Sequence, residues 1–232
     1  MPNPRAAARL PEWSLRSLAR RLAGLALLLW LSAALTLAAA RWVNPPTTAV
    51  QIERRIQATL AGKPYTRRYQ FVPLQSIAPD LQHAVIAAED ARFYQHHGFD
   101  WQAMEIAAEG DIHGRRLRGG STLTQQLVKN LLLGTERSYL RKGVEATLVP
   151  VAELVLGKRR ILELYLNVVE WGPGVYGAEA ASRYHFHTSA RRLSRTQAAE
   201  LAAILPAPRR RRPERMARYS AIIQQRMRQM GW

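Results

Sequence analysis

A run of 19 residues without a formal charge, residues 22–40, constrains this chain more than any other feature. The run reads LAGLALLLWLSAALTLAAA, and arginines flank it at positions 20, 21 and 41. As a helix it would rise about 28 Å, close to the roughly 30 Å hydrocarbon core of a bilayer. It therefore predicts a single transmembrane anchor. The alternatives are a signal peptide cleaved at Ala38-Ala39-Ala40, whose apolar part is usually shorter, and a buried soluble helix, which is rarely apolar all round.

Positive charge is concentrated at the two ends of the chain. The net charge is +17, and residues 205–232 carry eight arginines against one glutamate. Five arginines precede the anchor, at positions 5, 9, 16, 20 and 21. Because positively charged flanks stay inside, we expect a cytoplasmic N-terminus and a periplasmic main domain on the inner membrane. Anionic lipid headgroups are then the expected partners of the basic ends, and we expect no nucleic-acid partner. For residues 209–212 the alternative is that the arginines are simply solvated.

The remaining sequence indicates a connector followed by one helical domain. We place a basic cytoplasmic tail at 1–21, the anchor at 22–40, a connector at 41–67, the main domain at 68–208 and a basic C-terminal helix at 209–232. Prolines at 45, 46, 64, 73 and 79 punctuate the connector and its continuation, with one extended piece near 69–72. The chain contains no cysteine, which excludes a disulfide scaffold, a zinc finger and a thiol nucleophile.

The main domain is expected to be all-α, because its apolar residues recur with a period of 3.6 almost throughout. We expect helices to begin at Asp80 and Asp100 as N-caps, and residues 110–120 to form a loop. Thr122 and Gln125 form a capping-box pattern for a helix that ends before Gly134. The other predicted helices are 136–156, with a kink at Pro150 and a stop at Gly157, and about 158–168, 175–184, 195–204 and 213–229.

The first of four segments with chemical potential is EDARFYQHHGFD at 89–100. Glu89 and Asp90 are adjacent carboxylates at the end of an apolar helix, where a raised pKa would suit a general base. Two solvated acids at a helix end are the alternative. His96 and His97 have no metal-ligand spacing around them, so we interpret them as surface or packing residues.

The second segment is RGGSTLTQQLVKN at 118–130. Its glycine pair leads into a helix N-terminus, where free backbone N–H groups can meet an anion. Gln125 and Gln126 precede Lys129 by four and three residues, so one helical face presents amides and an ammonium group. An ordinary capped helix with a polar face is the alternative.

Arginine recurs every four residues in the third segment, RSYLRKGVE at 137–145. Arg137, Arg141 and Glu145 share one face, and two guanidinium groups suit a diphosphate because each can bind two oxygens. The alternative is a ladder of ion pairs along the helix. The fourth segment, KRRILELYLN at 158–167 with glycines at 172, 174 and 177, indicates an amphipathic helix and a turn, and we interpret it as scaffold.

In this order and spacing, the four segments resemble those of the peptidoglycan glycosyltransferases, glycosyltransferase family 51. Together with the anchor, the chain is similar to the monofunctional biosynthetic transglycosylase type. The resemblance extends from Arg68 to about Pro208. No lysine has a serine three residues before it, so no SxxK motif exists and we expect no transpeptidase activity.

The resemblance implies a lysozyme-like all-α fold with a large lobe and a smaller apolar lobe against the membrane. The apolar lobe would include Trp101, Met104, Ile106, Leu117 and residues 131–133, although simple core packing is an equal alternative for these. The implied reaction joins lipid II units into β-1,4 glycan strands with inversion and releases undecaprenyl pyrophosphate. Lipid II, the growing strand, membrane lipids and cell-division or elongation proteins are the expected partners.

The resemblance also assigns roles to individual residues. Glu89 is the expected base, and Glu145 is expected to position the pyrophosphate directly or through Mg²⁺ or Mn²⁺. The expected substrate-binding residues are Asp90, Phe93, Ser121, Thr122, Gln125, Gln126, Lys129, Arg137, Arg141 and Lys142.

Two features depart from the family pattern, and we expect activity to survive both. His185-Phe186-His187-Thr188 stands where relatives usually have Tyr-Phe-Gly-Lys, and Pro150 stands in a helix. Two other functions compete with the synthase. A lytic transglycosylase or lysozyme-type hydrolase would use a carboxylate on the same glycan but has no use for the Lys129, Arg137 and Arg141 cations. A membrane-anchored protein that binds nucleic acid or an acidic polymer would be indifferent to Glu89.

Overall fold

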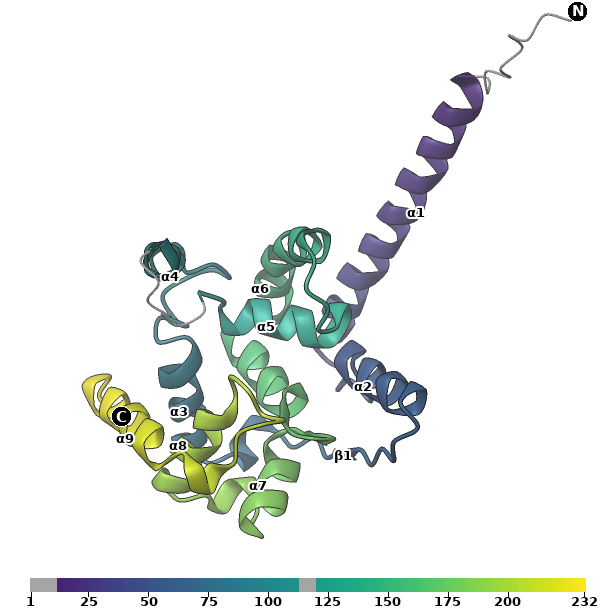
Figure 1. Ribbon diagram of the computed structural model, residues 1–232. Helices are drawn as coiled ribbons and strands as arrows, with labels where there is room; N and C mark the ends of the chain where they lie inside the picture. The colour runs from purple at the N-terminus through teal and green to yellow at the C-terminus, as the bar shows by residue number, and fades with distance from the viewer. Residues whose placement is uncertain (1–11, 113–119) are drawn as a thin grey trace, which may run out of the picture.

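The computed structural model describes residues 12–112 and 120–232 (Figure 1). Helix α1 (Glu12–Ala39) projects from a helical body as a long rod. Its segment Leu15–Ala39 is long and apolar enough to cross a membrane, and little of it is buried in the body. The predicted membrane anchor is therefore confirmed as a helix that can span a membrane by its length and composition. Arg5 and Arg9 of the basic tail, and Leu117, Arg118 and Gly119 of the predicted apolar lobe and glycine pair, lie outside the described residues.

A helix that the sequence analysis did not expect, α2 (Ala49–Leu60), occupies the predicted connector. Thr48 caps it by accepting a hydrogen bond from the Gln51 N–H, and Val50 is buried against the body. The prolines at 45, 46 and 64 lie outside α2 on both sides, so they delimit the helix and do not interrupt it.

The body is built from seven further α-helices and four short helical turns in the described part of the chain. The helices are α3 (Pro79–Glu89), α4 (Trp101–Ile112), α5 (Leu123–Val128), α6 (Tyr139–Val168), α7 (Ala178–Phe186), α8 (Arg195–Ile204) and α9 (Ala217–Gln229). The turns are η1 (Leu74–Ser76), the π-helical η2 (Lys129–Leu133), η3 (Ala190–Arg192) and η4 (Pro213–Arg215). The mostly helical fold class is confirmed.

Local capping signals placed several helix ends correctly. The Ala103 N–H donates to Asp100 Oδ1 at 3.0 Å, and Thr122 and Gln125 form the predicted capping box. Asp80 is not the N-cap of α3, because Pro79 already occupies the first helical turn and Ala78 precedes it. Helix α6 begins at Tyr139 and not at 136, since the hydroxyl of Ser138 accepts the Arg141 N–H.

The break within α6 lies at Gly157, where φ is 71° and the helical geometry is interrupted as predicted. Pro150 lies inside the helix without a break in the helical backbone angles, and a bend of the helix axis at that residue stays a prediction. The departure at 185–188 is accommodated at the end of α7, where His187 takes the left-handed conformation with φ of 53°. Glycine usually occupies such a position, so the glycine that the family pattern leads us to expect here would suit this backbone conformation.

A small three-stranded sheet is formed by residues that precede η1 and residues that follow α6. β3 (Val175–Tyr176) lies between β1 (Arg68–Tyr69), which is parallel to it, and β2 (Glu170–Gly172), which is antiparallel. The predicted helix 175–184 therefore starts only at Ala178. Gly174 has φ of 72°, and a Cβ there would lie 2.3 Å from the carbonyl oxygen of Thr66, so this tight turn requires glycine.

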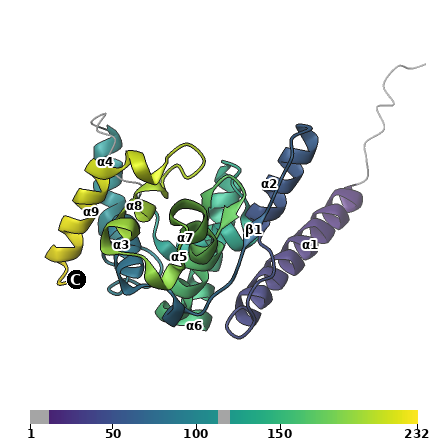
Figure 2. The ribbon, with the colours of Figure 1, turned by 90° about the horizontal axis from the view of Figure 1, so that it is seen from below.

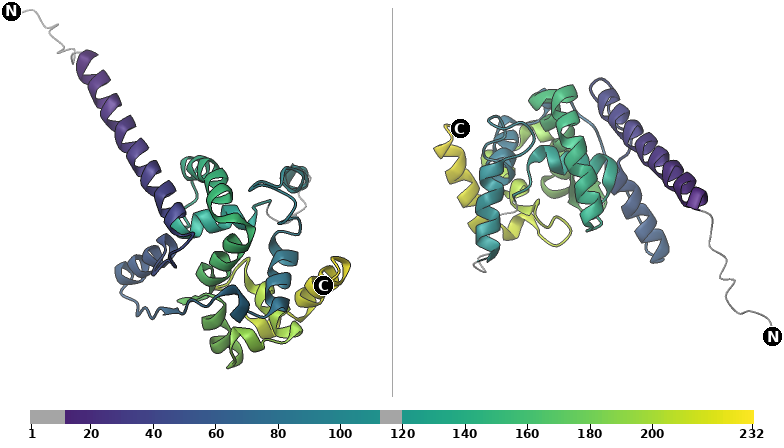
Figure 3. Two further views of the ribbon diagram at one scale, coloured as in Figure 1. Left: turned by 180° about the vertical axis from the view of Figure 1, so that it is seen from behind. Right: turned by 90° about the horizontal axis from the view of Figure 1, so that it is seen from above.

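The core lies where α3 and α6 meet α5, α8 and α9. Its largest fully buried side chains include Trp171, Tyr165, Tyr176 and Phe93. Helices α4 and α9 lie at one end of the body, and α1 and α2 lie at the other (Figures 2 and 3). The candidate site residues on α3, α5 and α6 lie between these two ends.

Candidate functional site

Glu89 is the last residue of α3 and is held by a chain of two hydrogen bonds. Its Oε2 accepts from Gln126 Nε2 at 3.0 Å, and Gln126 Oε1 accepts from the hydroxyl of Tyr165 at 3.0 Å. Burial, together with the charges of Glu89 and Asp90, raises the pKa of Tyr165 well above its ordinary value. The hydroxyl therefore stays a donor, which fixes the Gln126 amide with its NH₂ group toward Glu89.

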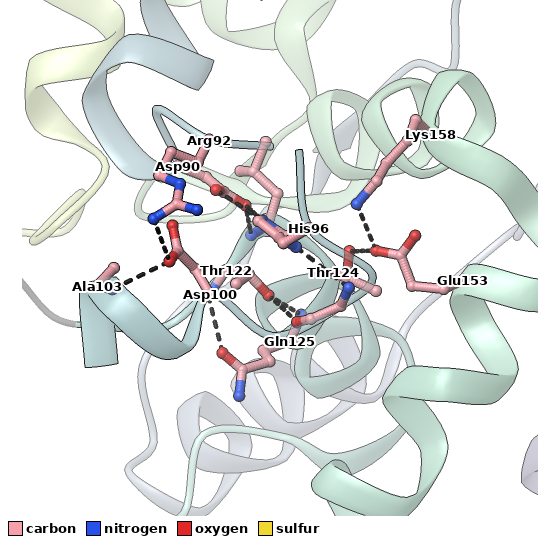
Figure 4. A network of polar contacts seen from close by, with 12 residues as sticks. Asp90, Arg92, His96, Asp100, Ala103, Thr122, Thr124, Gln125, Glu153 and Lys158 are labelled. Carbon is pink, nitrogen blue, oxygen red and sulfur yellow. Dashed lines mark hydrogen bonds and ion pairs between the residues drawn. The ribbon is translucent and has the colours of Figure 1, made fainter. Parts of the chain in front are cut away.

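Asp90, the next residue, lies in a buried network of polar contacts (Figure 4). Its two oxygens accept from His96 Nε2 at 2.9 and 3.1 Å, and Oδ2 also accepts the Leu123 N–H at 2.9 Å. The Gly98 N–H donates to His96 Nδ1, so the ring proton resides on Nε2 and faces the carboxylate. This network joins the segment after α3 to the N-terminus of α5.

Thr122 and Gln125 are also engaged within the protein. Both are buried, and Thr122 donates its hydroxyl to the Gly98 carbonyl at 2.7 Å in addition to the capping box. On the other side of the network, Glu153 accepts from Thr124 and from Lys158, at 2.6 and 2.8 Å (Figure 4). These bonds hold the start of α5 against α6. They therefore also help to fix Gln126, which lies in α5, and Lys129, which follows directly after it.

A cavity of about 530 Å³ opens beside Glu89. Its wall includes Ser121 and Thr122 from the second segment and Ile106 from α4. Helix α9 adds Tyr219 and Arg226, which the sequence analysis did not select as site residues. No local pattern marks them, because α9 reads as an ordinary basic amphipathic helix.

Glu145 is the centre of a cluster of basic groups on the first turns of α6. It is buried, and its oxygens accept from Arg141 Nη1 at 2.7 Å and from Lys142 Nζ at 2.5 Å. Burial is the largest influence on the pKa of Lys129 and lowers it, against the opposing effect of Glu145 and Glu89. Lys129 therefore interacts with the carboxylates of both Glu89 and Glu145, and the structure brings the second and third segments together.

Two predicted site residues differ in position from the rest. Phe93 is fully buried, and the ammonium group of Lys158 lies 4.6 Å from the centre of its ring. Arg137 is exposed and makes no hydrogen bond or ion pair with the residues that the structure describes. A direct contact of either residue with substrate stays a prediction.

The described residues contain no group of three or more His, Asp or Glu side chains arranged to hold a metal ion. Both oxygens of Glu145 are already occupied by Arg141 and Lys142. The donor set therefore does not fit a resident divalent cation held by protein ligands alone.

The family described as "Transglycosylase" matches residues 53–230. The chain belongs to the transglycosylase family, and it is a glycosyltransferase. It is 47% identical over 223 residues to the biosynthetic peptidoglycan transglycosylase of Pseudomonas putida (strain W619), covering 94% of each chain. The protein of that name from Pseudomonas aeruginosa PAO1 is 46% identical over 223 residues, covering 94% of this chain and 95% of its own.

The match to the transglycosylase family begins within α2 and continues one residue past the end of α9. Both helices contact the site: α9 lines the cavity of Glu89, and α2 packs against η2, which begins with Lys129. Tyr165 also belongs to the candidate site and was not selected by sequence reasoning. It lies in the fourth segment, which was interpreted as scaffold, and its bond to Gln126 joins positions 39 residues apart.

Proposed function

We propose that this glycosyltransferase polymerises lipid II into β-1,4 glycan strands with inversion and releases undecaprenyl pyrophosphate. The observation that carries the proposal is the placement of one oriented carboxylate, Glu89, beside a cluster of cations around Glu145. Such a pair supplies the two groups that glycosyl transfer to a hydroxyl with a pyrophosphate leaving group needs: a base and an anion-binding site. The names of the relatives, which are biosynthetic peptidoglycan transglycosylases, agree with this substrate class.

In the proposed reaction, Glu89 removes the proton from the sugar 4-hydroxyl of the acceptor. The resulting oxygen attacks the anomeric carbon of the donor while the bond from that carbon to the pyrophosphate oxygen breaks. The electron pair of that bond leaves with the pyrophosphate. Attack opposite the leaving group converts the α-linked donor into a β-linked product, which is inversion.

The pyrophosphate is proposed to bind Lys129, Arg141 and Lys142, with Arg137 reaching it from the exposed segment before α6. Arg141 and Lys142 now neutralise Glu145, so an entering pyrophosphate would share these donors with a carboxylate. Glu145 thus holds the cations in place before substrate arrives. We propose that Ser121 contacts the donor from the cavity wall. Gln126 would act mainly through its bond to Glu89.

A divalent cation, Mg²⁺ or Mn²⁺, stays part of the proposal as a companion of the substrate. Glu145 is the carboxylate that we propose for it, since Mg²⁺ commonly takes one or two carboxylates plus substrate phosphates. When bound, the ion would neutralise pyrophosphate charge. Chelation by EDTA followed by readdition of each ion tests this separately from the roles of the side chains.

The enzyme is membrane-anchored, and we propose that it works at the periplasmic face of the inner membrane with its N-terminus in the cytoplasm. The end of α1 is docked on α6: Trp30 donates to Thr147 at 2.9 Å and Arg41 donates to the Val155 carbonyl at 2.6 Å. On α6 these two contacts are separated by about 12 Å of helix. The first half of α6 therefore runs beside the outer part of the anchor, where Leu140 and other exposed apolar residues can meet lipid.

Polymerisation of labelled lipid II by the detergent-solubilised full chain tests the proposed function. Wild type should give high-molecular-weight product that muramidase digests and penicillin does not inhibit, and Glu89→Gln should give none. Asp80→Asn on the same helix is the matched control, since Asp80 pairs with Arg195 away from the site. Cleavage of preformed glycan without polymerisation would indicate a lytic enzyme. Equal polymerisation by wild type and Glu89→Gln would remove Glu89 from the role of base.

A further inference from the structure

Glu53 on α2 binds the turn at Gly134 and Thr135. This turn separates Lys129, the first residue of η2, from Arg141 and Lys142 in the first turn of α6. Oε2 of Glu53 accepts the Thr135 N–H at 2.6 Å, and its Oε1 accepts the Thr135 hydroxyl at 2.5 Å. Gln57, one helical turn later, donates to Oε1 at 2.8 Å and steadies the carboxylate. The two residues Glu53 and Thr135 are 82 positions apart in the sequence, so this contact exists only in the folded protein.

The carboxylate also packs onto the open side of Gly134. This residue has φ of 75°, and a Cβ added there would lie 2.7 Å from Glu53 Oε2. The positive φ favours glycine at this position. A Cβ here would also force the carboxylate of Glu53 to shift from its place against the turn.

Hydrogen bonds link this turn, and the residue that follows it, to Lys129 and to Arg141. On one side, the Gly134 N–H donates to the carbonyl of Lys129 at 3.0 Å and closes the π-helical turn η2. On the other side, the carbonyl of Glu136 accepts from Arg141 Nε at 2.5 Å. A shift of the turn would thus move Lys129 and Arg141 relative to each other.

Helix α2 is itself fixed at two places. Glu53 holds the cationic segment, and the neighbouring Arg54 pairs with Glu170 of β2 at 3.3 Å. Only residues 40–48 separate α2 from the membrane helix α1. Helix α2 therefore links the membrane anchor to the part of the body that carries Lys129 and Arg141.

We infer that Glu53 is a positioning residue for the pyrophosphate site: its carboxylate fixes the Gly134–Thr135 turn and so sets the spacing of Lys129 and Arg141. Glu53 itself touches neither substrate nor reacting atoms. The inference rests on the proposed function, because it takes Lys129 and Arg141 to be the pyrophosphate ligands.

The test measures polymerisation kinetics of the full chain together with inhibition by inorganic pyrophosphate. Glu53→Gln keeps the shape of the side chain but loses the charge and one of its two acceptor oxygens. We expect it to raise KM for lipid II and the pyrophosphate concentration for half inhibition by about three- to tenfold, with kcat changed less than about twofold. Thr135→Val should act similarly, and Thr135→Ser, which keeps the hydroxyl, should restore wild-type values.

The double variant with Glu53→Gln and Thr135→Val should be no worse than the stronger single variant, because both changes break the same contact. Arg55→Gln, an exposed charge removal on the same helix, is the matched control and should leave all three constants unchanged. A lower melting temperature in Glu53→Gln with unchanged KM and unchanged pyrophosphate inhibition would overturn the inference, since Glu53 would then be merely structural.

Arg141→Ala separates failure of this inference from failure of the proposed function. If Arg141→Ala weakens pyrophosphate inhibition and Glu53→Gln does not, the positioning role is wrong and the pyrophosphate assignment stands. If Arg141→Ala has no effect on pyrophosphate inhibition, the assignment of the cations fails, and the inference about Glu53 fails with it.

Discussion

Replacing Tyr165 by phenylalanine tests whether the orientation of Glu89 is built into the fold. The change removes one hydroxyl that donates to Gln126 Oε1 at 3.0 Å and leaves that amide oxygen without its buried partner. An unsatisfied buried acceptor costs about 1–3 kcal/mol. The amide can recover part of this cost only by rotating, which turns its oxygen toward the carboxylate of Glu89.

We therefore expect Tyr165→Phe to lower kcat/KM for lipid II by about 5- to 150-fold, the range that corresponds to about 1–3 kcal/mol at the transition state. Loss of the Gln126 donor also removes a hydrogen bond to the charged form of Glu89, and this raises the pKa of that carboxyl. The acidic limb of the pH–rate profile, below which Glu89 is protonated and inactive as a base, should accordingly move to higher pH.

The assay is continuous polymerisation of labelled lipid II from pH 4.5 to 9, paired with thermal unfolding of each variant. Tyr176→Phe is the matched control: Tyr176 is equally buried, and its hydroxyl bonds to Tyr65 in a part of the fold away from Glu89. In a Gln126→Ala background, Tyr165→Phe should have almost no further effect on kcat/KM. An unchanged acidic limb, with kcat/KM reduced no more than in Tyr176→Phe, would refute the orienting role.

Three further predictions concern the alkaline limb, the buried network and the membrane contact. Burial lowers the pKa of Lys129, so kcat/KM should begin to fall at a lower pH than it would with an exposed lysine. Lys129→Arg should remove this alkaline limb from the pH–rate profile, because a guanidinium group does not titrate. His96→Ala strips the buried carboxylate of Asp90 of its main donor and should reduce the free energy of unfolding by about 2–4 kcal/mol in urea titrations; a loss below about 0.5 kcal/mol would contradict the network. Leu140→Trp, at an exposed position in the first turn of α6, should add to the quenching by brominated lipid tails seen in wild type, whereas Tyr184→Trp on α7 should not; equal quenching by the two variants would contradict the proposed depth.

The parts of the fold that depend on neighbouring residues could be predicted from the sequence. Helix starts at Asp100 and Thr122 followed from side chains that cap backbone groups three residues away. The break at Gly157 followed from the freedom of glycine to leave helical angles. The errors were also local: Pro79 displaced Asp80 from the cap position, and helix α2 was missed because its flanking prolines suggested a connector.

Site residues could be selected by type but not by what they contact. Thr122, Gln125 and Gln126 share one short helix, yet the first two are buried in the capping box while the third reaches Glu89. The sequence gives all three the same polar character. Only packing against α3 and α6 distinguishes the side chain that meets the carboxylate from those that stabilise the helix.

The sequence by itself determined the membrane anchor, the helical class and the residue types of the four segments, because an uncharged run, a 3.6-residue period and caps act over a few residues. Tertiary structure alone decided how those residues work together. Gln126 meets Glu89 across 37 positions and Tyr165 across 39, and Glu53 meets Thr135 across 82. Such pairs form only when the burial of apolar faces brings distant helices together, and no local pattern in the chain records which partner each polar group will find.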